Sequence, residues 1–147
     1  MKMRRLISAI IALLLVVNLS VTAFAAEWYL EDGDITVSAG DSGQTVSQGS
    51  STGVADNAPV IKQHDSSKTT DSTITIKTTG DATANVTIQD INISSNGDAI
   101  DVGSSSANIT LEGDNKIFSE TGSALHVSNG DVTITLSLIH ISEPTRH

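Results

Sequence analysis

The sequence predicts an all-β fold, a right-handed parallel β-helix (a solenoid) with about 23 residues in each coil. Three observations predict it: short β-branched runs alternate with polar turn segments, the runs repeat at a fixed offset, and aromatic residues make up only 3% of the chain. Large aromatics are not needed inside so narrow a cylinder. A β-sandwich is the alternative, since short strands with frequent turns suit that architecture as well.

The first predicted element is a secretory signal peptide, residues 1–25. It combines a basic start, an apolar run over 6–17 and the small-x-small pattern Ala23-Phe24-Ala25. The apolar run is too short to span a bilayer comfortably, so we expect cleavage after Ala25 or Ala26 rather than anchoring. We therefore expect a secreted, extracellular chain with no membrane partner after cleavage, attached to a cell wall if a further C-terminal region carries an anchor.

Residues 26–80 are predicted to form an N-terminal cap and irregular first coils. Ile35-Thr36-Val37 and Ile74-Thr75-Ile76 alternate as strands do, whereas 44–58 and 64–72 are rich in turn residues and are expected to be turns or loops. Trp28 and Tyr29 begin this segment. We expect them to close the end of the fold, and their aromatic rings also make them candidate sugar-binding residues.

Residues 81–135 carry the regular repeat. Asn85-Val86-Thr87-Ile88 is matched by 108–111 and again by 131–134, at offsets of 23 residues. Two further runs, 91–93 and 97–102, have counterparts at 116–118 and 122–127. Each unit thus holds three short strands and three turns, the content of one β-helix coil. Val, Ile, Leu and Ala are expected to stack inward, with Thr, Ser, Asn and Asp outward.

The last residues differ from the repeat. Residues 136–146, LSLIHISEPTR, resemble the translation of a widely used sequencing adapter. We therefore leave 136–147 out of the fold as an adapter-derived artefact, and expect the natural chain to continue past Thr135, so that the β-helix is truncated at its C-terminal end. The alternative is a native last strand, because LSLIHIS alternates as a strand does.

The charge balance excludes one class of partner. Residues 26–135 hold 16 acidic side chains, four lysines and no arginine. Phosphate contacts need clustered basic residues, so we expect no nucleic-acid partner. The chain also has no cysteine, which excludes disulfides and thiolate metal sites.

One string has a catalytic counterpart. Asn96-Gly97-Asp98-Ala99-Ile100-Asp101 resembles the Asn-Thr-Asp-Gly-Ile-Asp motif of polygalacturonases, which are β-helix glycoside hydrolases. The resemblance implies a catalytic carboxylate at Asp98, and Asp98 and Asp101 are also candidate binding residues. Inverting hydrolysis needs a second carboxyl group, and the family's adjacent Asp-Asp pair is missing one coil later, over 119–123. We therefore expect no catalytic site, with Asp98 in a turn and Asp101 facing outward.

Candidate metal ligands are few. Asp90 and Asp114 lie at or near turns and could bind Ca²⁺, which prefers hard oxygen ligands, but no calcium-loop motif connects them. We expect turn-forming roles and no cofactor, with Ca²⁺ as the alternative. His64 and His126 show no spacing typical of a catalytic or metal site, so we expect both to be solvated.

Taken together, residues 28–135 resemble β-helical carbohydrate-binding or adhesin-like modules of surface proteins from Gram-positive gut bacteria. The shared pattern comprises 33–37, 59–61, 73–76, 85–93 and 108–115. The resemblance implies an exported, non-catalytic module that binds a polysaccharide or a host or cell-wall glycan, or mediates adhesion. The alternatives are an N-terminal fragment of a polygalacturonase-like enzyme and a structural stalk without a ligand. The acidic surface predicts a preference for neutral glycans, or calcium-dependent binding of acidic ones.

Overall fold

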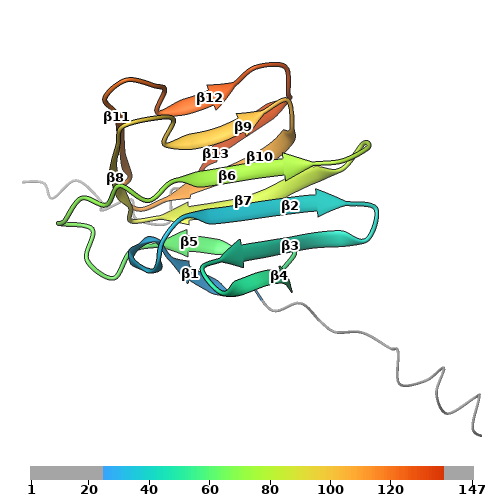
Figure 1. Ribbon diagram of the computed structural model, residues 1–147, viewed down its shortest axis with the longest axis horizontal. Coiled ribbons are helices and arrows are strands. Elements are labelled where there is room, and N and C mark those ends of the chain that lie inside the picture. The colour runs from blue at the N-terminus through green and yellow to red at the C-terminus, as the bar shows by residue number, and fades with distance from the viewer. Residues whose placement is uncertain (1–24, 138–147) are drawn as a thin grey trace, which may run out of the picture.

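The computed structural model describes residues 25–137, which form a β-solenoid of stacked parallel coils with roughly three turns (Figure 1). Strands make up 56% of the structure. The helical element of this part of the chain is one short 3-10 helix, η1 (Leu30–Asp32). No helix long and apolar enough to cross a membrane occurs within 25–137. Residues 1–24 of the predicted signal peptide and residues 138–147 of the adapter-like segment lie outside the described residues. Leu136, which we predicted to lie outside the fold, is the last residue of β13 (Val132–Leu136), and the Ser137 backbone N–H donates to the Leu111 carbonyl oxygen at 2.9 Å.

Three sheets form the walls of the solenoid. Sheet A contains, in spatial order, β1 (Glu27–Tyr29), β5 (Val60–Lys62), β7 (Thr83–Gln89), β10 (Ser106–Glu112) and β13 (Val132–Leu136). Sheet B contains β12 (Leu125–Val127), β9 (Ile100–Gly103), β6 (Ile74–Thr78), β2 (Ile35–Gly40), β3 (Gly43–Gln48) and β4 (Ser51–Ala55). Sheet C pairs β8 (Asn92–Ser95) with β11 (Lys116–Ser119).

The strand pairing decides between the two predicted architectures. Successive coils pair in parallel throughout the three sheets, and the antiparallel pairs are β2–β3 and β3–β4. A β-sandwich is built from antiparallel sheets. The parallel solenoid is therefore confirmed, and the sandwich alternative is wrong.

The repeat length is less uniform than the sequence suggests. Val86 pairs with Ile109, 23 residues later, as predicted. Ile109, however, pairs with Ile134 rather than with Val132, and the coils lie about 25 residues apart. The next coil has one extra residue before β11 and another before β12. The predicted match of 91–93 with 116–118 is therefore wrong by one residue, since Ile93 pairs with Ile117 and Phe118 is exposed. The extra residues lie in turns, so paired strand positions keep the same orientation.

Aliphatic side chains stacked from coil to coil fill the interior. On sheet B, Ile35 pairs with Ile74 and Ile74 with Ile100. On sheet A, Ile61 pairs with Ile88. All five side chains are at most 3% exposed. Burial of each isoleucine contributes about 1.5–3 kcal/mol, so the stacking of apolar rows holds the coils together.

Residues 44–58 differ from the prediction of turns and loops. They contain most of β3 and all of β4, an antiparallel hairpin that extends sheet B beyond β2. Val37 of β2 pairs with Val46 of β3, and both are fully buried. Residues 64–72 do form a loop, as predicted, with one isolated parallel bridge from Thr70 to Ile93.

Two buried glutamines make the hydrogen bonds that a missing strand would make. The Gln44 amide nitrogen donates to the carbonyl oxygens of Asn85 (2.9 Å) and Asp56 (3.1 Å), and its amide oxygen accepts from the Asn85 backbone N–H (2.7 Å). β5 begins only opposite Thr87, so it does not reach Asn85. Gln63 acts similarly, accepting from the backbone N–H of Asn92 in β8.

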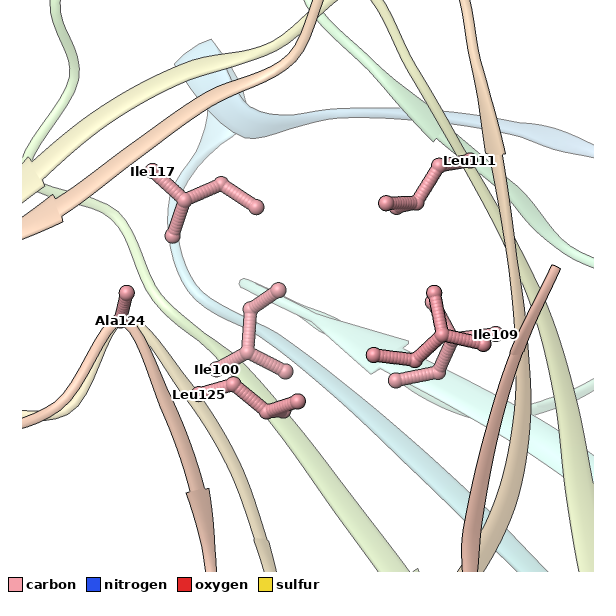
Figure 2. A pocket seen from close by; sticks show the side chains of 7 residues that line it. Ile100, Ile109, Leu111, Ile117, Ala124 and Leu125 are labelled. Atoms are coloured by element: carbon pink, nitrogen blue, oxygen red, sulfur yellow. The ribbon is translucent and has the colours of Figure 1, made fainter. Parts of the chain in front are cut away.

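The two ends of the solenoid differ. At the N-terminal end, Leu30 of η1 is fully buried and Trp28 packs against the core. At the other end, four large hydrophobic side chains of the last strands are exposed: Phe118, Val127, Ile134 and Leu136. A hollow of about 120 Å³ opens there, and Figure 2 shows its apolar side chains pointing toward one another. Within residues 25–137, the N-terminal end is therefore closed and the C-terminal end is open.

Candidate functional site

The residues predicted as catalytic or binding candidates near Asp98 come together with a histidine from the next coil. Asp98 lies in the turn before β9, and Asp101 lies within β9, next to the inward-facing Ile100. In the parallel register of β9 and β12, Asp101 pairs with His126. Alternation along the strands therefore places the Asp101 and His126 side chains on the outer face of sheet B.

The three side chains form a compact, half-exposed cluster. His126 Nδ1 lies 2.9 Å from Asp101 Oδ1 and 3.4 Å from Asp98 Oδ2. The other oxygen of Asp98, Oδ1, accepts the backbone N–H of Ser123 at 2.7 Å. The Asp98 side chain is 32% exposed, and those of Asp101 and His126 are 44% and 42% exposed. Asp98 thus joins the turns of two neighbouring coils.

The electrostatics of this cluster favour a protonated imidazole. The hydrogen bond to Asp101 raises the pKa of His126 above its ordinary value, and the charge of Asp98 adds to that effect, while partial burial opposes it. An ionised carboxylate only accepts hydrogen bonds, so Nδ1 carries the proton shared with Asp101. The second ring nitrogen of His126 remains for solvent or a ligand.

The same three residues can offer one ligand atom each to a metal ion. These atoms lie within 4.8 Å of one another, and Asp98, Asp101 and His126 are the one such group found within residues 25–137. Two carboxylates with one imidazole suit a divalent cation. Binding would displace the proton that His126 shares with Asp101, so metal and proton compete for this cluster.

The aromatic candidates at the N-terminal end are already engaged. The Trp28 indole N–H donates to Asp56 Oδ2 at 2.9 Å, and the side chain is half-buried against the core. The Tyr29 ring stacks on His64 with centroids 3.6 Å apart, and its hydroxyl donates to Glu27 Oε2 at 2.6 Å. The structure thus places Trp28 at the closed end and Tyr29 on the outer side of β1.

The calcium candidates lie in a turn contact between two coils. Asp90 adopts a left-handed backbone conformation, with φ of 49°, and its Oδ1 accepts the backbone N–H of Asp114 at 2.9 Å. A side chain on Gly113 would collide with this carboxylate, since an added Cβ would lie 2.0 Å from Asp90 Oδ1. The contact fixes the spacing of the two turns.

The outer face of sheet A carries a second set of aligned polar residues. Asn85, Asn108 and Thr133 lie in register on β7, β10 and β13, and Thr87, Thr110 and Thr135 form a parallel row beside them: we call these six residues the sheet A ladder. Asn108 Nδ2 donates to Asn85 Oδ1 at 3.0 Å. Neighbouring strands lie about 4.8 Å apart, so the ladder presents its amide and hydroxyl groups at a regular spacing.

His126 is the member of the Asp98 cluster that reasoning from the sequence missed. The repeat of 97–102 at 122–127 already places His126 one coil after Asp101. That alignment was the available signal, because equivalent positions of stacked coils lie side by side.

Comparison of the chain with protein families, with curated proteins and with solved structures finds no match.

Proposed function

We propose that this chain is an exported, non-catalytic β-solenoid module that binds carbohydrate, or mediates adhesion by doing so. The sheet A ladder is the observation that carries the proposal. Its amides and hydroxyls repeat from coil to coil in one register, and such groups donate to and accept from sugar hydroxyls. A repetitive polymer can meet equivalent groups at successive coils, and several weak contacts then add up in one ligand.

The arrangement around Asp98 supports a non-catalytic role. One Asp98 oxygen accepts a backbone N–H of the next turn, and the other faces His126. Oxygens of Asp98 and Asp101 lie within 4.8 Å of each other. Inverting glycosidases hold their two carboxyl groups about 6.5–9.5 Å apart to admit water.

The charge of the chain favours neutral glycans. Net charge is −9, and the six ladder residues themselves are uncharged. A uronic-acid polymer would approach against the field of the surrounding carboxylates, unless Ca²⁺ bridged the two acidic surfaces. Neutral polymers meet no such repulsion.

The proposal is tested by placing a charge in the ladder. Thr110→Glu puts a carboxylate at the centre of the face without touching the core, because Thr110 points outward on β10. We expect retention of the purified chain on insoluble neutral polysaccharides, such as cellulose, xylan and β-glucan, to weaken about tenfold, which corresponds to a free energy of about 1.4 kcal/mol.

Ser38→Glu is the matched control, because Ser38 is half-exposed on β2 in sheet B, away from the ladder. We expect it to bind as the unaltered chain does. Equal loss of binding in both variants would show that the ladder is not the binding surface. Failure of the unaltered chain to bind any polysaccharide in the set would contradict carbohydrate binding and favour a structural stalk.

A further inference from the structure

Asp56 is a fully buried carboxylate whose partners are uncharged. Its Oδ2 accepts the indole N–H of Trp28 at 2.9 Å and the backbone N–H of Ala26 at 3.1 Å, and its Oδ1 accepts the backbone N–H of Ala58 at 3.1 Å. Within residues 25–137, no lysine or histidine side chain forms an ion pair with it. A buried charge without a counter-charge is costly, so a cation in contact with Asp56 would stabilise the ionised carboxylate.

The nitrogen of Ala26 occupies the position where that cation is needed. It lies 3.1 Å from Asp56 Oδ2, and the carbonyl oxygen of the same residue accepts the backbone N–H of Val60 at 2.9 Å. Ala26 is thereby fixed between β5 and the buried carboxylate, directly before β1. If the chain began at Ala26, its nitrogen would be an ammonium group in hydrogen-bond contact with Asp56.

We propose that the mature chain begins at Ala26, and that its new α-ammonium group forms an ion pair with buried Asp56 that locks the N-terminal end of the solenoid. The proposal rests on the expected export of the chain, and it does not depend on what the module binds. Two cleavage positions, after Ala25 and after Ala26, fit the sequence, and the contacts of Ala26 select the first.

Cleavage one residue later would remove these contacts. A chain starting at Glu27 has neither the Ala26 nitrogen beside Asp56 nor the Ala26 carbonyl beside Val60. The reaction is hydrolysis of the Ala25–Ala26 amide by a signal peptidase with water as co-reactant. The water oxygen bonds to the Ala25 carbonyl carbon as the C–N bond breaks, and the products at neutral pH are the Ala25 carboxylate and the Ala26 ammonium group.

The position of cleavage is measured directly. The full-length chain is exported from a bacterial host, and its intact mass and N-terminal sequence are determined. We expect Ala26 as the first residue. A first residue of Glu27, or a chain that retains residues 1–25, would overturn the proposal.

The ion pair is measured on the same exported protein. The α-amine is labelled by reductive methylation with ¹³C-formaldehyde, and its resonance is followed by NMR as the pH is raised. An ordinary α-amino group titrates at about 7.7–8.0, and a carboxylate in contact raises that value by about one unit or more. The other charges on the neighbouring strands, Glu27 and Lys62, pair with each other at 3.1 Å. Titration of the unaltered chain at or below the ordinary value would overturn the ion pair.

Asp56→Asn provides the matching variant. We expect the α-amino group to titrate about one unit lower than in the unaltered chain, whereas Asp71→Asn, at an exposed loop position, leaves it unchanged. An equal titration in the unaltered and Asp56→Asn chains would overturn the ion pair. If Asp56→Asn does not fold, the titration of the unaltered chain decides alone.

Discussion

Gln44→Ala tests whether a single side chain replaces a missing stretch of strand. In the structure the Gln44 amide is only 6% exposed and makes three hydrogen bonds, two to Asn85 and one to Asp56. Truncation to alanine leaves the N–H and C=O of Asn85 without this partner, along with the C=O of Asp56. The hairpin β3–β4 also loses this polar link to β7 of sheet A.

The expected cost follows from those three bonds. A buried backbone group left without a partner costs about 1–3 kcal/mol, and water reaches part of this site because Asn85 itself is exposed. We therefore expect Gln44→Ala to lower the free energy of unfolding by about 3 kcal/mol. For a chain of this size that corresponds to a fall in Tm of about 10 °C.

Two assays check this value. Denaturant unfolding followed by circular dichroism and by fluorescence of Trp28, the single tryptophan, gives the free energy. Hydrogen exchange gives the protection of the Asn85 amide, which we expect to fall more than that of its neighbours on β7. Thr45→Ala, at a half-exposed neighbouring position of β3, is the control and should change stability by less than about 0.5 kcal/mol. A loss below that limit for Gln44→Ala, or unchanged protection of Asn85, would refute the reasoning.

Three further predictions concern the turns, the histidine and the open end. Gly122→Ala should destabilise the fold by about 1–3 kcal/mol, because the added Cβ would lie 2.6 Å from Asp98 Oδ1 and 2.7 Å from the Asp98 backbone nitrogen. Gly97→Ala is the control and should be near neutral, because no atom lies within 4 Å of its added Cβ. Equal unfolding curves for the two variants would contradict this prediction. The pKa of His126 should lie above its ordinary value of 6.5, so the stabilisation from protonated His126 is present below pH 6.5 and is lost as the pH rises through the folded-state pKa. NMR should show a lower pKa of His126 in Asp101→Asn. An unchanged pKa would exclude the Asp101 hydrogen bond as the cause of the raised value. The exposed apolar end should make the chain self-associate. Ile134→Lys should therefore lower the mass measured by light scattering at high concentration, whereas Val54→Lys, at a similarly exposed valine on β4, should not. A strictly monomeric unaltered chain would contradict self-association.

The periodic part of the fold could be read from the sequence because its physics is local and repeated. Val86 and Ile109 face inward in successive coils for the same reason, which is alternation along a strand. Their spacing is visible in the sequence without knowledge of any contact. The turns are less predictable, since one extra residue in each of two turns changes the offset from 23 to 25. At β11 this shift places Ile117, not Phe118, opposite Ile93.

The hairpin and the sites depend on contacts between distant residues. Residues 44–58 have the composition of turns, and β3 is held in place by the pairing of Val37 with Val46 and by Gln44 bonding 41 residues away. Asp56 sits in a segment typical of turns, and its burial follows only once Trp28 is placed beside it. Composition and periodicity do not indicate which distant residues form such pairs.

The candidate site was partly predictable. Asp98 and Asp101 stand out through their motif, but the motif does not reveal that Asp98 accepts the backbone N–H of Ser123. His126 becomes a member only when the coils are stacked in the observed register.

The most direct test of carbohydrate binding compares neutral and acidic polymers under one set of conditions. Affinity electrophoresis of the exported chain is run in gels containing β-glucan or polygalacturonate, each with Ca²⁺ and with a chelator. The uncharged sheet A ladder within an acidic surface predicts retardation by the neutral polymer in both buffers, and by polygalacturonate only when Ca²⁺ is present. Strong retardation by polygalacturonate in the chelator, or no retardation by any neutral glycan, would contradict the proposed function.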